Sequence, residues 1–165
     1  MGSVCGWCGR PLVAASTGRP RRWCSTRCRK AASRSPFPPV MIGRRSWCRA
    51  DGKRPVTPSG APASSTDSGT WCSFAEVRSG SAFGIMLGDG LGCYDLDHVT
   101  DDQARRFMAT IREPVLYCER SVSAEGVHVF VEAPEGPGRR RIVDGVSVER
   151  YSRARFIRTT GRRFT

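Results

Sequence analysis

Several features that would assign this chain to a familiar class of protein are missing from its sequence. No apolar run approaches the roughly 20 residues of a membrane-spanning helix. The opening MGSVCGWCGR lacks the basic, apolar and small-residue regions of a signal peptide, and no internal repeat is present. We therefore expect a cytoplasmic protein, and its 165 residues suffice for one ordinary domain and a small appendage.

Lysine is also scarce, since Lys30 and Lys53 are the only lysines among 27 basic residues. Such a bias is typical of a GC-rich genome, and arginine is the better bidentate ligand for phosphate. The net charge of +12 suits a polyanionic partner, and it bears on partners and solubility rather than on fold.

Acidic residues are few and unevenly placed. Residues 1–54 hold 13 basic side chains and one acidic, residues 55–138 hold 5 basic and 12 acidic, and residues 139–165 hold 9 basic and 2 acidic. An acidic middle between basic flanks is typical of a metal site beside surfaces that hold phosphates. For any single arginine, a solvated surface position is the commoner explanation.

Composition divides the chain into three segments. Residues 1–34 are basic and carry cysteines, so they are predicted to form a zinc-binding module. Residues 35–69 are rich in Pro, Ser, Gly and Thr and are predicted to be linker and lead-in loop. Residues 70–165 have the regular apolar pattern of a folded core.

The core pattern predicts a helix, two strands, a second helix and four strands. Thr70 is expected to cap a first helix that runs to about Arg78, and Thr100 and Gln103 have capping-box spacing at the start of the second helix, TDDQARRFMATIR. Strands are predicted over residues 82–87, 92–99, 115–120, 127–133, 146–152 and 155–160. This order predicts an α+β or mixed α/β sheet.

Four of the eight cysteines have metal-ligand spacing. Cys5-x2-Cys8 is followed, after fifteen residues, by Cys24-x3-Cys28. Two close pairs of thiolates make a tetrahedral structural zinc site. The second pair has helical i, i+4 spacing, and a module this small needs the metal to fold.

The stretches CGWCGRP and RPRRWCSTRC resemble those of small zinc ribbons. Free thiols in a basic tail, or a redox pair, are the alternatives to zinc. An arginine cluster favours nucleic-acid contact, with protein docking as the other option: Arg19, Arg21, Arg22, Arg27 and Arg29. The other thiols lack ligand spacing and are expected to be small core or surface residues: Cys48, Cys72, Cys93 and Cys118.

A pair of carboxylates, Asp95 and Asp97, lies on the predicted strand GCYDLDHV. Alternate residues of a strand point to the same face, so the two carboxylates converge while Tyr94 and Leu96 face the other way. Such pairs are hard oxygen ligands for Mg²⁺ or Mn²⁺. Two ions of this kind can activate a hydroxyl nucleophile and stabilise a leaving pyrophosphate. Asp-x-Asp alone also occurs in glycosyltransferases, phosphatases and ordinary turns.

Two further elements accompany the acidic pair. In SAEGVHVFVEA a polar turn with Ser123 and Gly126 enters a strand at His128, which can meet a triphosphate, although a lone histidine there is more often structural. In VERYSRARFIRTTG, Glu149 adds a third carboxylate on a strand and Arg155 follows it.

In this order YDLDH, SAEGVH and VERYSRARFIRTTG resemble the motifs of the archaeo-eukaryotic primase superfamily, in particular the bifunctional primase–polymerase domains of phages and plasmids. The lead-in GKRPVTPSGAPASSTDSGTWCSFAEV is also similar to the entry of that family, and the similarity spans about residues 44–164. The resemblance implies an α+β core with an RRM-like sheet and template-directed nucleotidyl transfer, as a DNA primase, a DNA polymerase or both.

The resemblance also implies roles for particular residues. Catalytic Mg²⁺ or Mn²⁺ would be held by Asp95, Asp97 and Glu149, and the nucleotide would be contacted by Ser123, His128 and Arg155. Implied partners are a single-stranded DNA template, nucleoside triphosphates and a replicative helicase or other replication protein. Replication of a phage or mobile element in the cytoplasm of a bacterial host is the implied setting.

The sequence departs from the family pattern at two places. Ala124-Glu125 replaces the usual glycine after the serine and puts an acid near the expected triphosphate. Family members usually continue beyond the Thr160-Gly161 position, so we expect de novo priming to need another polypeptide or to be lost.

Two other classes of function stay open. One is a zinc-ribbon DNA-binding replication factor with a degenerate, non-catalytic primase-like domain. The other is a nuclease or replication-initiator endonuclease, which is disfavoured because His128-Val-Phe supplies no His-x-His pair and Tyr151 is predicted on a strand. We expect the acidic site on the open face of the sheet, with the arginine-rich residues 139–163 as one wall of a nucleic-acid groove.

Overall fold

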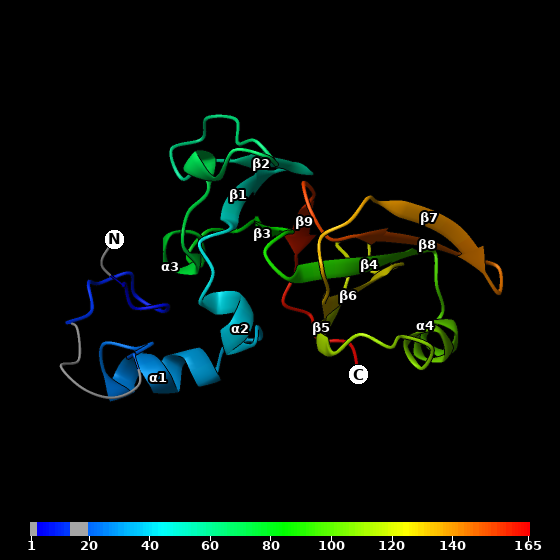
Figure 1. The fold of residues 1–165 in the computed structure, drawn as a ribbon, viewed down its shortest axis with the longest axis horizontal. Helices are drawn as coiled ribbons and strands as arrows, with labels where there is room; N and C mark the ends of the chain where they lie inside the picture. The colour runs from blue at the N-terminus through cyan, green and yellow to red at the C-terminus, as the bar shows by residue number, and fades with distance from the viewer. Residues whose placement is uncertain (1–2, 14–19) are drawn as a thin grey trace.

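Two antiparallel sheets carry the fold, which the computed structural model describes for residues 3–13 and 20–165 (Figure 1). The first sheet has the strand order β2-β1-β3-β9, with β1 at Trp47–Asp51, β2 at Arg54–Val56, β3 at Phe83–Met86 and β9 at Phe156–Thr159. The second has the order β5-β6-β4-β8-β7, with β4 at Leu91–Asp97, β5 at Val115–Arg120, β6 at Val127–Glu132, β7 at Arg139–Val143 and β8 at Val146–Tyr151.

The helices are short and lie at the margins of the sheets. In Figure 1, α1 (Thr26–Ser33) and α2 (Pro39–Ile42) lie toward one end of the molecule and α4 (Asp101–Met108) toward the other. The 3₁₀ helix η1 (Ser68–Thr70) and α3 (Phe74–Val77) precede β3. No helix in the described part of the chain combines the length and apolar character that crossing a membrane requires.

One face of the five-stranded sheet, which we call the α4 face, packs against α4. Leu96, Val129 and Val148 come from three neighbouring strands and form a buried cluster with Ala104 and Phe107 of the helix. Complete burial of one such large apolar side chain contributes about 1.5–3 kcal/mol. Thr100 caps α4 through the predicted capping box with Gln103, and these contacts fix the helix over the sheet.

The opposite face, which we call the front face, packs in part against the first sheet. Cys93, Tyr117 and Phe130 of the second sheet join a buried cluster with Trp47 of β1 and Ile85 of β3. The α+β class and the mostly antiparallel sheet are therefore confirmed, and two cores sandwich β4, β5 and β6 between them.

The structure differs from the sequence expectation over residues 35–69. The segment contains α2, β1, β2 and η1 instead of linker and loop alone. Trp47 is fully buried, and its indole N–H donates to the Met41 carbonyl at 3.0 Å. The polar composition conceals β1 because its partner β3 follows far along the chain, with Trp47 opposite Ile85. This is tertiary pairing that local propensity does not report.

Three smaller differences have local causes. The first predicted helix starts after Ser73, whose N–H donates to Glu76 at 2.8 Å, while Thr70 lies in η1. The second, predicted through Arg112, ends at Met108. Strand β7 is missed because its arginines leave little apolar pattern, as is common on an edge strand.

The cysteine-bearing segment lies against the core. Trp7 and Trp23 pack on the front-face cluster, and the Trp7 ring lies 6.0 Å from the Phe74 ring. The Arg78 guanidinium also contacts Trp7 and lies 4.6 Å from the centre of its ring. Within the described residues, α1 and this segment therefore share the core of the first sheet.

Candidate functional sites

The first candidate site is the four-cysteine cluster. The thiol sulfurs of Cys5, Cys8, Cys24 and Cys28 all lie within 4.8 Å of one another, which is the arrangement that a zinc ion needs. Cys28 lies on α1, whereas Cys24 precedes the helix, which Ser25 caps by accepting the Cys28 N–H at 3.2 Å. The helical i, i+4 spacing of this pair therefore places Cys28 on α1 and leaves Cys24 just before the helix.

Electrostatics in the cluster call for a cation. Burial raises the pKa of Cys5, but N–H donors of Cys24, Cys8 and Trp7 outweigh it and lower the pKa to about 6. Hydrogen bonds with Cys8 and Cys28 raise the pKa of Cys24 to about 12. Four thiolates this close repel one another, and a bound divalent ion removes that cost. The donor set therefore fits Zn²⁺. Arg19 of the predicted arginine cluster lies outside the described residues.

The second candidate site is a row of polar residues across all five strands of the second sheet. Glu119 on β5 pairs with His128 on β6, His128 with Asp95 on β4, Asp95 with Glu149 on β8, and Glu149 with Arg140 on β7. Residues directly opposite in a sheet share a face. We call these five the polar row, and it crosses the front face next to its buried apolar cluster.

The predicted acidic pair lies on this face. Asp97 follows Asp95 by two residues on β4, and Tyr94 and Leu96 are buried on the α4 face, as the strand period requires. Burial raises the pKa of Asp95, and the charges of Asp97 and Glu149 raise it further against the opposing effect of His128.

His128 bridges two carboxylates. Its Nε2 lies 3.6 Å from Asp95 and its Nδ1 lies 3.1 Å from Glu119. Glu119 is completely buried and also accepts the N–H groups of Thr160 and Gly161 at 3.0 and 2.9 Å. Glu119 thus fixes His128 and ties the end of β9 to the second sheet.

Glu149 is held by three neighbours. It accepts the Tyr151 hydroxyl at 2.8 Å, and it pairs with Arg140 and with Arg155 at 3.7 Å each. The Arg155 guanidinium also lies 4.4 Å from the Tyr151 ring. The third carboxylate of the sequence motif therefore lies beside Asp95 on the sheet, although cationic side chains partner it.

A groove of about 820 Å³ opens over two members of the polar row, Asp95 and His128. It is lined by five of the predicted site residues: Asp95, Asp97, Ser123, His128 and Arg155. Glu149 lies beside Asp95 but does not line the groove.

Basic residues that the sequence analysis did not single out also line this groove. Lys53 comes from the turn between β1 and β2, and Arg158 comes from β9, where it donates to the Gly52 carbonyl at 3.0 Å. Lys53 is missed because its segment is taken for a linker, and Arg158 because one arginine among many carries no signal. Glu119 has a weak signal, since it follows the buried Tyr117 by one strand period.

The turn before His128 is built from its own polar side chains. Ser121 accepts the Gly126 N–H at 3.1 Å and lies 3.1 Å from the Ser123 hydroxyl. A side chain at Gly126 would come within 2.6 Å of the Leu96 carbonyl, so the position requires glycine because of close packing. Glu125 is exposed and lies 3.4 Å from His98, outside the set that lines the groove.

The two sites differ in how closely they gather metal ligands. Within residues 3–13 and 20–165, the four cysteines form the one group of three or more ligand side chains close enough to hold an ion. Three carboxylates share the front face but do not lie that close together: Asp95, Asp97 and Glu149. Their oxygen donors suit Mg²⁺ or Mn²⁺ in kind.

No model of a known protein family matches the chain, and no curated protein is recognisably similar to it.

Proposed function

We propose that this chain is a template-directed nucleotidyltransferase, a DNA primase, a DNA polymerase or both, acting in the replication of a phage or mobile element. The observation that carries the proposal is the polar row, which brings Asp95, His128 and Glu149 onto neighbouring strands of one open face. The three residues come from three separate sequence motifs. Their convergence is what the resemblance to the primase superfamily implies for an RRM-like sheet.

The groove supports a nucleotide as the substrate. Asp95 and Asp97 line it from one face of β4, and divalent ions on such oxygens activate a hydroxyl and stabilise pyrophosphate. Lys53, Arg155 and Arg158 supply positive charge around the same groove and would hold the triphosphate. Ser123, in the turn before β6, and His128, on β6, line the same groove and would contact the nucleotide.

Two residue pairs at the groove assign different roles to Arg155 and His128. Arg155 is paired with Glu149, and a bound triphosphate would compete for the guanidinium. Release of Arg155 would remove one of the two cationic partners of Glu149, while Arg140 and the Tyr151 hydroxyl would still contact its carboxylate. His128 is oriented by Glu119, so its Nε2 points toward Asp95 and the groove.

Residues 1–34 are proposed to form a structural zinc module on this core. Removing zinc with a chelator should unfold the segment, since structural zinc contributes about 10–16 kcal/mol of binding free energy in small modules. Circular dichroism would measure this unfolding, and metal analysis would measure the zinc content, in the wild type and in Cys8→Ser. A chelated protein that keeps its spectrum and its stability would contradict a structural zinc.

The proposed function is tested by incorporation of labelled nucleotides with Mg²⁺ or Mn²⁺ on primed and unprimed single-stranded templates. We expect extension by the zinc-loaded wild type and a loss of at least a thousandfold in Asp95→Ala/Asp97→Ala, as for removal of catalytic ligands. Products on the unprimed template would add primase activity. Absence of products with the wild type on either template would contradict catalysis by this chain alone.

A non-catalytic DNA-binding replication factor is the second candidate. It is favoured by the ligand geometry, because the cysteines lie close enough for a metal ion and the three carboxylates do not. It predicts that Asp95→Ala/Asp97→Ala binds single-stranded DNA as the wild type does and that neither protein extends a primer.

A further inference from the structure

A second groove, of about 840 Å³, adjoins the groove over the polar row. Ser65 and Ala154 line both, so the two grooves meet at these residues. Each alone matches the size of a small-ligand pocket. Joined, they make one path that leads from the acidic pair to the region between α2 and β3.

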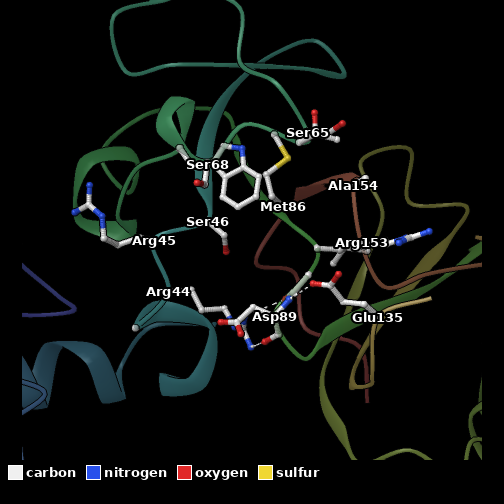
Figure 2. Close-up of a pocket in the computed structure, with 15 residues that line it drawn as sticks. Arg44, Arg45, Ser46, Ser65, Ser68, Met86, Asp89, Glu135, Arg153 and Ala154 are labelled. Atoms are coloured by element: carbon white, nitrogen blue, oxygen red, sulfur yellow. Dashed lines mark hydrogen bonds and ion pairs between the residues drawn. The ribbon is translucent and has the colours of Figure 1, made fainter. Parts of the chain in front are cut away.

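The walls of the second groove carry positive charge on opposite sides. Figure 2 shows Arg45 and Arg153 on opposite sides of the groove, with Ser46 and Met86 between them. Both arginines are exposed. Neither has an ion-pair partner within the described residues, so both are available to a polyanion.

The two acidic residues that line this groove, Asp89 and Glu135, contact other groups of the protein. Arg44 donates to the carbonyls of Gly88 and Asp89 at 3.2 and 2.9 Å and lies 3.8 Å from the Asp89 carboxylate. Glu135 accepts the Asp89 N–H at 2.9 Å, as Figure 2 shows. These contacts fix the turn after β3 as one end of the groove, and Arg44 partly offsets the charge of Asp89.

The turn between β8 and β9 lies where the two grooves meet and contributes lining residues to both. Arg153 lines the second groove, Arg155 lines the first, and Ala154 between them lines both. Ala154 has φ of 50°, in the left-handed region that a non-glycine residue seldom adopts. Ser152 is completely buried and anchors the turn by accepting the Gly136 N–H at 2.9 Å. The turn therefore contributes one arginine to the lining of each groove.

Trp71 gives the second groove an aromatic wall. Its indole N–H donates to the Ser64 carbonyl at 2.7 Å, which fixes the ring, and the side chain is only partly buried. A fixed, partly exposed aromatic ring between arginines is the arrangement on which nucleic-acid bases stack irrespective of sequence. A duplex offers its bases only at groove edges, so the ring favours a single strand.

From this arrangement we infer that the second groove is a single-strand nucleic-acid path, in which Trp71 stacks a base and Arg45 and Arg153 hold the flanking phosphates of a strand that continues past Ala154 to the acidic pair. The direction of the strand toward Asp95 rests on the proposed function. The binding of a strand by the second groove does not.

The test is binding of labelled oligothymidylates of about 4 to 16 nucleotides, the range of single-strand site sizes in small domains, without added Mg²⁺ or Mn²⁺. We expect wild-type affinity to rise with length until both grooves are filled. Trp71→Ala and Arg153→Ala should each weaken binding of the longer oligonucleotides about tenfold and flatten the dependence on length. Arg106→Ala, an exposed arginine on α4, is the matched control and should bind as the wild type does.

Trp71→Phe is the control for a loss of folding in Trp71→Ala. It keeps a ring for stacking but loses the indole, so it should retain most of the affinity while the DNA-induced quenching of tryptophan fluorescence falls. Unchanged binding by both Trp71→Ala and Arg153→Ala would overturn the inference. Equal affinity of the shortest and longest oligonucleotides would also overturn it, since that result describes a small-ligand pocket.

Failure of this inference can be told from failure of the proposed function. If the wild type extends primers but Trp71→Ala and Arg153→Ala bind normally, the function stands and the strand runs elsewhere. If no protein extends primers but these variants bind weakly, the path stands and the catalytic proposal fails.

Discussion

The two faces of the five-stranded sheet treat carboxylates in opposite ways. On the α4 face, Glu113 accepts hydrogen bonds from the Tyr94 hydroxyl at 2.9 Å and from Arg150 at 3.1 Å. Burial raises the pKa of Glu113, but these donors and its own N–H outweigh burial and lower it. On the front face, burial raises the pKa of Asp95, and Asp97 and Glu149 add to the effect.

This difference separates stability from function. The α4 face places one carboxylate against two donors that lie opposite each other in register, Tyr94 and Arg150. The front face places Asp95 beside two other acids at the edge of a groove, which weakens the fold unless a cation binds. Unrelieved charge of this kind is concentrated at functional sites.

The largest expected effect comes from Glu119, a completely buried carboxylate of the front face whose two oxygens both accept hydrogen bonds. Glu119→Ala would leave His128 and the N–H groups of Thr160 and Gly161 without an acceptor, at a cost of about 3–5 kcal/mol. Urea unfolding measures this cost. Glu119→Gln keeps one acceptor and should lose less. If both variants unfold as the wild type does, Glu119 is not the anchor of the polar row.

The next effect concerns the α4 face. Glu113→Gln should lower the unfolding free energy by about 1–2 kcal/mol at neutral pH, because charged hydrogen bonds to Tyr94 and Arg150 are weakened. The lowered pKa of Glu113 means that its stabilisation is present above the ordinary value of 4.5 and is lost as pH falls through the lowered pKa. Unfolding measured across this range should bring the two proteins together at acidic pH. A difference that is constant with pH would contradict the assignment.

A smaller effect distinguishes the faces through β7, where the three arginines alternate. Arg140 lies opposite Glu149 on the front face, while Arg139 and Arg141 lie opposite Arg150 and Val148 on the α4 face. Arg140→Ala should therefore weaken binding of single-stranded DNA and lower the slope of log affinity against log salt by about one. Arg141→Ala is the matched control.

Fluorescence anisotropy over a salt series makes this comparison. Equal losses in Arg140→Ala and Arg141→Ala would contradict a groove confined to the front face. The expectation that residues 139–163 form one wall of a nucleic-acid groove stays a prediction.

The smallest effect concerns Asp95, whose influence on stability changes with pH in the opposite direction to that of Glu113. Because the pKa of Asp95 is raised, stability falls as pH rises from the ordinary aspartate value of 3.8 through the raised pKa. Asp95→Asn removes this loss, so without divalent ions its melting temperature should be slightly higher than that of the wild type at neutral pH and equal at acidic pH. Asp97→Asn, which is exposed, is the control. A lower melting temperature of Asp95→Asn at neutral pH would contradict the account.

Much of the second sheet is predictable from the sequence because its signals are local. VLYCER forms β5 over Val115–Arg120 as predicted, and the capping box of Thr100 and Gln103 forms as its spacing requires. Alternation on β4 correctly separates Asp95 and Asp97 from Tyr94 and Leu96.

The rest depends on contacts that no local pattern encodes. β1 is stabilised by β3, with Trp47 opposite Ile85, so its own composition gives little sign of a strand. The polar row needs the register of five strands, and Glu119 and Arg140 become part of it only through that register. The second groove likewise joins Arg45, Trp71 and Arg153 from three distant segments.

Mn²⁺ binding to the zinc-loaded protein tests the central claim most directly. Calorimetric titration of the wild type should detect Mn²⁺ binding that is lost in Asp95→Asn/Asp97→Asn and retained in Glu113→Gln, because Asp95 and Asp97 line the groove whereas Glu113 is bound by Tyr94 and Arg150. Equal binding of Mn²⁺ by the wild type and Asp95→Asn/Asp97→Asn, or no binding by either, would contradict a catalytic metal site on the front face.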